Sequence, residues 1–239
     1  DRSPSRGLGD VYKRQIQNHI ENRFRDIGYT VKSKILYASD FGVPQRRNRL
    51  FIVGNRNGID FEFPKEFDYS VSVDEAISDL PVLGNGEIQM KGEYTVPFEQ
   101  ASPYAQLMRK KSKAPTQNIV SRNKDYVVER YKYIGQGENW SSIPDRLMEN
   151  YADKKRCHSG IYKRLIGGKP SVVISNYRKS MLIHPHQDRG LSVREAARLQ
   201  SFPDHFIFEG PVSYVQQQIG NAVPPLLAKA VMKKILTYK

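Results

Sequence analysis

The chain has 239 residues, 38% of them hydrophobic, which is enough to bury a core in one or two domains. Its longest apolar runs, such as 50–53, are too short for a membrane span, and a single cysteine, Cys157, excludes a disulfide framework. A net charge of +13 favours a polyanionic partner, nucleic acid first, with an ordinary basic protein as the alternative.

Residues 5–15 resemble the in-frame translation of a transposase sequencing adapter, since 10–15 can be back-translated as GAT GTG TAT AAG AGA CAG. We therefore expect residues 1–15 to be a non-native leader, with the native chain starting near Ile16 and some upstream sequence missing. A natural basic tail is the alternative. Without these residues the formal charge is still +11, so the charge argument does not depend on them.

Apolar residues at helical spacing predict the first native helix over 16–27, which Gly28 should end. Two strands are predicted next, over 29–36 and 50–53, because both stretches are rich in β-prone residues. This order of elements is typical of part of an α/β domain. From 55 to about 177 the chain becomes polar, aromatic and rich in proline.

Three later helices have start signals. The capping boxes Ser72–Glu75 and Ser192–Glu195 each predict a helix, the second running through Leu199. The two prolines at 224–225 predict the start of the last helix, since proline is favoured in the first turn of a helix. One stripe of that helix carries Leu227, Val231 and Ile235.

The turn between the first two strands reads DFGVPQRRNR over residues 40–49. Three arginines in four positions follow a proline-stiffened turn and precede a buried strand. Planar guanidinium groups suit two-point contacts with phosphates or base edges better than lysine does. A solvated cluster of charges is the alternative.

Two further segments read LSVREAARLQSFPD over 191–204 and QIGNAVPP over 218–225. In chain order, GVPQRRNR over 42–49 and these two segments resemble motifs VIII, IX and X of the DNA (cytosine-5)-methyltransferases. The three motifs follow one another as they do in that family. The resemblance covers essentially all of residues 16–239.

The resemblance implies an α/β fold in which an incomplete, Rossmann-like, S-adenosylmethionine-dependent methyltransferase domain is joined to a smaller, mixed, β-rich domain. Residues 16–55 and 212–239 would belong to the catalytic domain. Residues 56–211 would form the small domain, with motif IX and a target-recognition region at about 60–180.

The implied reaction moves a methyl group from S-adenosylmethionine to C5 of a cytosine flipped out of double-stranded DNA. The family's nucleophile lies in a Pro-Cys-Gln motif and its glutamate in a Glu-Asn-Val motif, and the 239 residues contain neither. Cys157 lacks those neighbours and is expected to be a bystander. We therefore expect this chain alone to be inactive. A non-catalytic DNA-binding specificity subunit of a split methyltransferase is the alternative.

By resemblance, Arg47 and Arg49 would lie at the flipped cytosine and its phosphates, and Gln45 would line the gap left in the duplex. Other arginines are expected to contact DNA: Arg46, Arg194 and Arg198. For the last two, pairing with Glu195 is a structural alternative.

Also by resemblance, Asn221, Ala222 and Val223 would approach the methionine end of S-adenosylmethionine. Asn221 could equally cap the last helix. The family's first glycine-rich motif is missing from the sequence, so the cofactor site would be incomplete.

The expected partner is double-stranded DNA, with a restriction endonuclease encoded nearby as a second candidate. The full-length protein is expected to be a monomer in the cytoplasm of a prokaryotic cell, or phage-encoded, away from membranes. No metal is expected, since His184 and His186 make only a weak two-histidine pattern.

Overall fold

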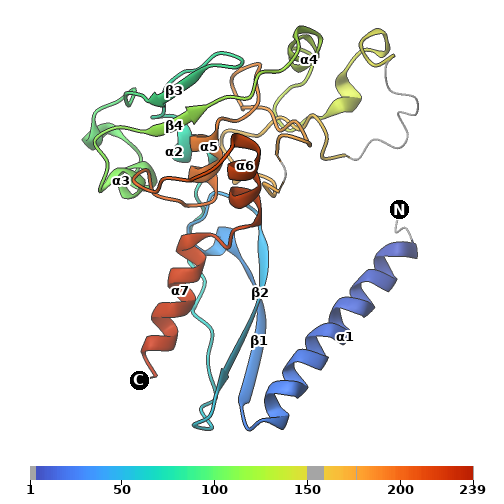
Figure 1. Cartoon of the computed structure of the whole chain (residues 1–239), viewed down its shortest axis with the longest axis vertical. Coiled ribbons are helices and arrows are strands. Elements are labelled where there is room, and N and C mark those ends of the chain that lie inside the picture. The colour runs from blue at the N-terminus through green and yellow to red at the C-terminus, as the bar shows by residue number, and fades with distance from the viewer. Residues whose placement is uncertain (1–3, 150–158, 176, 239) are drawn as a thin grey trace. The chain divides into compact units, whose positions relative to one another are not determined.

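The computed structural model describes residues 4–149, 159–175 and 177–238 (Figure 1). Its contacts define two compact units. The first comprises Asp1–Leu36, Asn48–Lys65 and Ala230–Lys239, and the second comprises Tyr37–Arg47 and Glu66–Lys229. Neither unit is therefore one continuous stretch of sequence, and the domain boundaries at 55 and 211 remain predictions.

The first unit contains helix α1 (Pro4–Asp26) and most of strands β1 (Thr30–Tyr37) and β2 (Asn48–Asn55), which form a two-stranded sheet. The helix predicted over 16–27 and both predicted strands are confirmed. Gly28 follows α1 with a φ of +89°, a left-handed conformation that glycine adopts without steric cost. The helix begins at Pro4, so it includes part of the expected leader.

Polar side chains, rather than apolar ones, join α1 to β1. Nε2 of Gln17 donates to Oγ of Ser33 (2.8 Å), and that hydroxyl donates to Oε1 of Glu21 (2.6 Å). The hydrogen bond from Ser33 is the largest cause of the lowered pKa of Glu21. The apolar stripe of the helix stays 37–44% exposed at Ile16, Ile20 and Phe24, and Ile27, directly after the helix, is 59% exposed.

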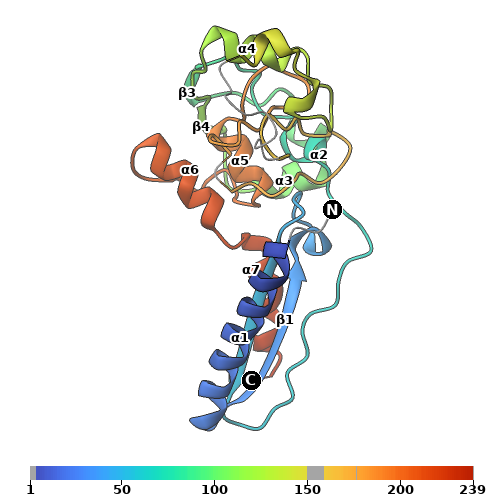
Figure 2. The same cartoon turned by 90° about the vertical axis from the view of Figure 1, so that its right-hand side faces the viewer.

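In the second unit, short helices pack around a small antiparallel sheet, seen in Figures 1 and 2. Strand β3 (Ile88–Lys91) pairs with β4 (Thr116–Ile119), with Ile88 opposite Ile119 and Lys91 opposite Thr116. The α-helices are α2 (Val73–Ile77), α3 (Pro103–Arg109), α4 (Asp125–Tyr131), α5 (Val193–Leu199) and α6 (Val212–Asn221). The 3-10 helices are η1 (Ala38–Phe41), η2 (Phe98–Gln100), η3 (Trp140–Ser142) and η4 (Asp145–Leu147).

The prediction of a β-rich small domain is wrong for the described residues of this unit, where β3 and β4 have four residues each. Extended segments also meet in isolated bridges, such as Gln45 with Ser171 and Val120 with Ser192. Prolines recur throughout these segments, and each one lacks the amide hydrogen that a ladder needs. Short bridges therefore replace a continuous sheet.

Both predicted capping boxes are confirmed. Oγ of Ser72 accepts a hydrogen bond from the amide of Glu75, and Oγ of Ser192 accepts one from the amide of Glu195 (both 3.2 Å). Each glutamate in turn accepts from the amide of its serine. Helices α2 and α5 start where predicted, and both contribute apolar side chains to the larger core of the unit.

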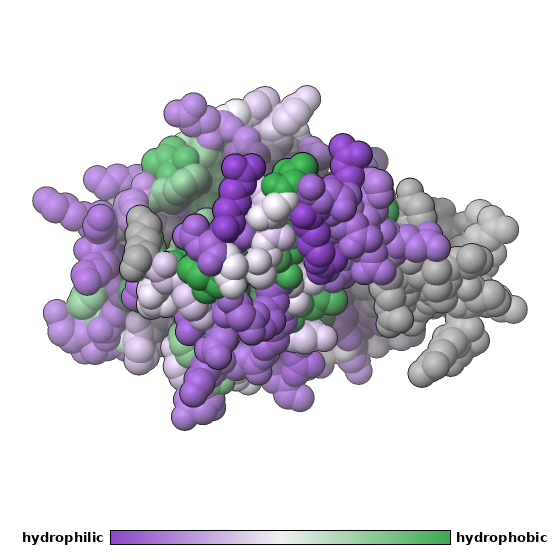
Figure 3. Space-filling model, turned by 90° about the horizontal axis from the view of Figure 1, so that it is seen from below, coloured by the Kyte–Doolittle hydropathy of each residue, from purple (hydrophilic) through white to green (hydrophobic). Residues whose placement is uncertain are grey.

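The last helix, α7 (Pro225–Leu236), also starts within the predicted proline pair. Leu227 and Val231 are buried, as their shared stripe predicted, and Ile235 is half-buried. In the part of the chain that the structure describes, no helix combines the length and apolar character needed to cross a bilayer. Figure 3 shows a mainly hydrophilic face on which apolar residues form separate patches.

Candidate functional site

The arginine-bearing turn is closed by backbone hydrogen bonds. Gly42 ends η1 with a φ of +74°, and the amide of Ala38 donates to the carbonyl of Arg47 across the turn (2.7 Å). The turn also pairs with Ser171, whose amide donates to Pro44 and whose carbonyl accepts from Arg46 (both 2.9 Å). The backbone of residues 44–46 is therefore fixed against residue 171.

Gln45 is fully buried, with 0% of its surface exposed. Its Nε2 donates to the carbonyl of Leu199 (3.1 Å), and its Oε1 accepts from the amide of Ile174 (3.0 Å). Both polar ends of the side chain are thus occupied inside the protein. The expectation that Gln45 lines a gap in DNA is corrected: the side chain positions the turn against α5 and residue 174.

Arg47 is also buried, at 3% exposure. Its Nη1 donates to the carbonyl of Ile174 (2.8 Å) and its Nη2 to the carbonyl of Gly220 (2.6 Å). Among the described residues, its Nε has no hydrogen-bond partner. This arrangement corrects the expectation that Arg47 lies at the DNA, because its donors face backbone carbonyls of the protein.

Residues 171–175, which we call the joining segment, are where the three sequence motifs meet. Nε2 of Gln200, in the second motif, donates to the carbonyl of Ile219 (2.8 Å), in the third, and lies 3.5 Å from the carbonyl of Ile174. Gly220 packs so closely on the joining segment that a β-carbon there would overlap the carbonyl oxygen of Ser175. Segments more than 170 positions apart in sequence are thereby held together.

Two arginines of the turn remain accessible. Arg46 is exposed, and Arg49, in β2, is partly exposed. Nη1 of Arg49 donates to the carbonyl of Asn48 (2.8 Å), and partial burial lowers the pKa of Arg49. These two side chains, rather than Arg47, can reach a polyanion outside the protein.

Arg194 and Arg198 are both 0% exposed, which corrects the expectation that they contact DNA. Arg198 bonds the carboxylates of Asp79 (2.9 and 3.2 Å) and Asp204 (2.6 and 2.7 Å). Burial would lower the pKa of Arg198, but the two carboxylates outweigh burial and raise it. Arg194 donates to the carbonyls of Thr116, Pro203 and Phe206.

Glu195 pairs with Arg189 rather than with the helix arginines, through hydrogen bonds of 2.9 and 2.7 Å. Burial alone would raise the pKa of Glu195, but Arg189 outweighs it and lowers the pKa to about 2. His184 lies beside this pair, its Nε2 3.7 Å from Oε1 of Glu195. Burial lowers the pKa of His184 to about 4, so this imidazole is neutral at pH 7.

Asn221 is exposed and is the last residue of α6, four positions before the first residue of α7, so it does not occupy the cap position of α7. Ala222 follows as the helix cap and is half-buried, and Val223 is 43% exposed. The three residues thus offer one amide side chain and one apolar side chain at the surface.

The cysteine and the two histidines considered from the sequence do not form a site among the described residues. Cys157 lies outside the described residues. His184 and His186 do not face a common centre: Nε2 of His186 lies 2.8 Å from Oδ1 of Asp74, and His184 is buried. Within residues 4–149, 159–175 and 177–238, no group of three or more potential metal-ligating side chains occurs.

Sequence reasoning gave neither the joining segment nor Gln200 a role in bringing the motifs together. The segment is marked in the sequence only by Pro170 and a short apolar run, which give no sign of its partners. Gln200 stands inside the second motif, directly after a capped helix, and a glutamine at a helix end could have been suspected of bonding carbonyls.

The three motifs that meet at the joining segment are those that resemble the DNA (cytosine-5)-methyltransferases. Residues 5–237 match the family described as C-5 cytosine-specific DNA methylase, and the chain belongs to this family. It is 35% identical over 219 residues to Type II methyltransferase M1.HphI of Haemophilus parahaemolyticus, covering 91% of this chain and 50% of the relative. It is 32% identical to Type II methyltransferase M.DdeI of Desulfomicrobium norvegicum, covering 95% and 59%. The chain thus spans half to three fifths of these relatives' lengths.

Solved structures have a similar fold. A protein encoded within an Escherichia coli prophage and described as a DNA modification methyltransferase matches with a TM-score of 0.69 and 23% identity, over 93% of this chain and 64% of that one. The methyltransferase EhMeth of Entamoeba histolytica matches with a TM-score of 0.51 and 11% identity, over 93% and 58%. At these identities the likeness shows a shared mixed α/β fold.

Proposed function

We propose that this chain supplies the DNA-contacting and target-positioning part of an S-adenosylmethionine-dependent DNA (cytosine-5)-methyltransferase. The observation that carries the proposal is the joining segment, on which Gln45, Arg47 and Gln200 bring the three family motifs together. Six buried hydrogen bonds of side chains to backbone hold this junction. Such a junction fixes the arginine-bearing turn relative to the motif X residues, as positioned chemistry requires.

The accessible arginines would meet the DNA. We propose that Arg49 holds the edge of the flipped cytosine and that Arg46 contacts a phosphate. Arg47 and Gln45 are positioning residues in this scheme, because their polar atoms are turned to the protein backbone. The backbone of Arg46 is fixed against Ser171, so its planar guanidinium starts from a rigid base and loses little entropy on binding.

The residues after α6 fit one end of S-adenosylmethionine. The exposed Asn221 amide can both donate and accept, which suits an amino acid carboxylate and ammonium, and Val223 offers an apolar contact. When bound, this cofactor supplies the electrophilic methyl group. Other parts of the ligand would need residues that this chain does not provide, since it lacks the glycine-rich motif.

Residues 1–239 alone are proposed not to transfer methyl groups, because the Pro-Cys-Gln and Glu-Asn-Val motifs are not in this sequence. Incubation with labelled S-adenosylmethionine and cytosine-containing duplex, followed by counting of label in the DNA, tests this point. Incorporation that rises in proportion to the purified chain would contradict it. The proposed setting is the prokaryotic cytoplasm, with DNA as partner, a monomeric full-length enzyme and a restriction endonuclease encoded nearby.

DNA binding by the turn is tested with duplex DNA and fluorescence anisotropy between about 50 and 200 mM salt. We expect Arg46→Gln and Arg49→Gln each to weaken binding, and each lost phosphate contact to lower the slope of log K against log salt by about 0.9. Arg23→Gln is the matched control, since Arg23 is an exposed arginine of α1. It should leave the affinity nearly unchanged.

Comparison of the turn variants with Arg23→Gln distinguishes a specific interface from attraction by net charge. Greater losses for the turn variants than for Arg23→Gln support the proposed interface. Equal losses in all three variants would mean that net charge, and not the turn, attracts DNA, and the proposal would then be wrong.

A further inference from the structure

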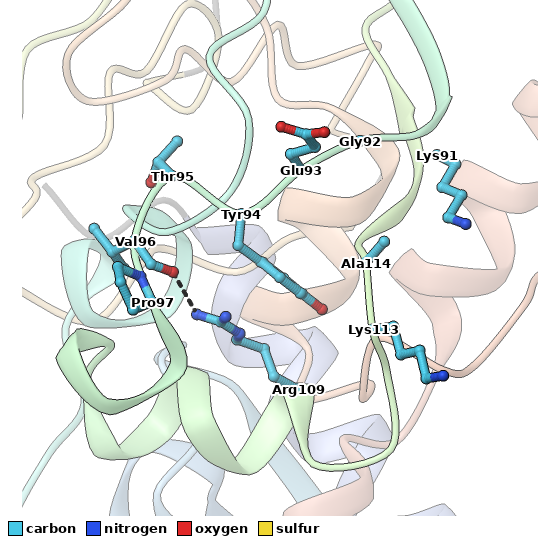
Figure 4. A pocket seen from close by; sticks show the side chains of 10 residues that line it. All are labelled: Lys91, Gly92, Glu93, Tyr94, Thr95, Val96, Pro97, Arg109, Lys113 and Ala114. Carbon is cyan, nitrogen blue, oxygen red and sulfur yellow. Dashed lines mark hydrogen bonds between the residues drawn. The ribbon is translucent and has the colours of Figure 1, made fainter.

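A pocket of about 610 Å³ opens between β3, α3 and the start of β4 in the second unit, and it shares no residue with the arginine-bearing turn (Figure 4). Three cationic side chains line it, from Lys91, Arg109 and Lys113. Glu93 is its one carboxylate. In Figure 4 the two lysines lie on the same side of the view, across Tyr94 from Val96 and Pro97. The lining therefore has a positive balance.

Arg109 is the buried member of this group, at 7% exposure. Its guanidinium lies 3.8 Å from the centre of the Tyr94 ring, and Nη1 donates to the carbonyl of Val96 (3.1 Å). Nε of Arg109 has no hydrogen-bond partner among the described residues. Stacking on the Tyr94 ring and the hydrogen bond to Val96 hold the Arg109 cation in a fixed position in the lining of the pocket, where its charge favours an anionic ligand.

The interior behind the pocket does not neutralise this charge. Three guanidinium groups, of Arg109, Arg194 and Arg198, are buried, as are two carboxylates, of Asp79 and Asp204. Arg194 donates to backbone carbonyls and to Oγ1 of Thr116 rather than to either carboxylate. Both carboxylates already bond Arg198 (2.6–3.2 Å), and Asp79 lies 3.5 Å from Nη1 of Arg109. One buried positive charge therefore remains in excess beneath a pocket with two lysines at its edge, which favours an anionic ligand.

We infer that this pocket binds a phosphate group of a nucleic-acid backbone, at a site separate from the arginine-bearing turn. The pocket is large enough for a phosphodiester with its sugars, and Lys91 and Lys113 can approach phosphate oxygens as point charges. Free inorganic phosphate shares this chemistry and is the other source to be distinguished.

The test compares two double variants of the whole chain. Lys91→Gln with Lys113→Gln removes the lysines of the pocket, whereas Lys110→Gln with Lys111→Gln removes two exposed lysines of the same basic run that do not line it. Both variants lose two charges. Inorganic phosphate is titrated by calorimetry, and a fluorescein-labelled 20-base-pair duplex by anisotropy over a range of salt. Thermal melts confirm that both variants are folded.

We expect the pocket variant to weaken phosphate binding about fivefold or more and the control to leave it unchanged. For the duplex, we expect the pocket variant to lower the salt slope by about 1.8, and the control by clearly less. Equal effects of both variants on both ligands would overturn the inference. Loss of phosphate binding with unchanged duplex binding would overturn the nucleic-acid assignment. Because the phosphate titration involves no DNA, its result does not depend on the proposed function.

Discussion

The two units of the chain bury their side chains very differently. In the second unit every residue of α5 is buried, and even its arginines bond carboxylates or carbonyls. In the first unit, α1 turns Glu21 to the sheet and leaves its apolar stripe exposed. Exposed apolar residues also stand on both strands, with Ile35 at 51% and Leu50 at 43%.

The difference shows that apolar spacing identifies a face of a helix but not what covers it. Both α1 and α5 carry apolar residues at helical spacing. Those of α5 lie in the core of the second unit, whereas those of α1 stay largely exposed, with a ring contact between Phe24 and Tyr29 (5.7 Å between ring centres). Stability should therefore reside mainly in the second unit, where burial and satisfied ion pairs coincide.

The largest effect is expected for Arg198→Met. It removes the only guanidinium that bonds both Asp79 and Asp204 in the described structure, leaving two buried carboxylates without their main partner. Breaking a buried pair in this way costs about 3–5 kcal/mol. The free energy of unfolding in urea measures the loss.

The matched change in the first unit is Arg25→Met. Arg25 pairs with Glu21 at 2.7 Å but is 47% exposed, so water screens the pair and its loss should cost less than about 1 kcal/mol. Similar losses for the two variants would contradict the contrast between the units.

The second effect is a dependence of stability on pH. Burial lowers the pKa of His184 from 6.5 to about 4 in the folded chain, so the unfolded chain binds this proton first as the pH falls. Stability from this group is complete above about pH 6.5 and is lost between there and pH 4, by up to about 3 kcal/mol. Glu195, Arg189, His186 and Arg164 supply the charges that act on the ring.

Unfolding in urea at several pH values between 4 and 8 checks this expectation. His184→Asn should flatten the profile between pH 6.5 and 4, whereas His205→Asn, which alters an exposed histidine, should not. An unchanged slope in His184→Asn would assign the dependence to other groups.

Much of the fold was predictable because its signals are local. The capping boxes at Ser72 and Ser192 fixed the starts of two helices through hydrogen bonds within three residues. The roles of Gln45 and Arg47 were not predictable, because their partners lie 127 to 173 positions away. Arg198 has one partner only six positions away, Asp204, but its other carboxylate, Asp79, is 119 positions away. The sequence alone does not show whether an arginine contacts DNA or a buried carboxylate.

The third effect in size is expected for Gly220→Ala, which changes the packing of Gly220 on the joining segment. In Gly220→Ala the new methyl group would overlap the backbone of Ser175, which cannot move as a side chain can. We expect a loss of about 1–3 kcal/mol in the free energy of unfolding. Gly168→Ala is the control, because a β-carbon there meets nothing within 4 Å. If Gly220→Ala were as stable as the control, the three motifs would not be tightly packed at this point.

The smallest effect is expected on the exposed stripe of α1. Ile20 is 37% exposed and lies outside both core clusters of buried residues, so Ile20→Gln removes little buried apolar surface. Glutamine is also a good helix former, and the change should stay within about 0.5 kcal/mol. The same substitution at Ile219, which is 0% exposed in the core of the second unit, should cost several times more because it buries an amide without its hydrogen bonds. Urea unfolding of both variants gives the ratio of the two losses in the free energy of unfolding. A large loss for Ile20→Gln would mean that the stripe is covered in solution. The two units would then differ less in how they bury apolar side chains.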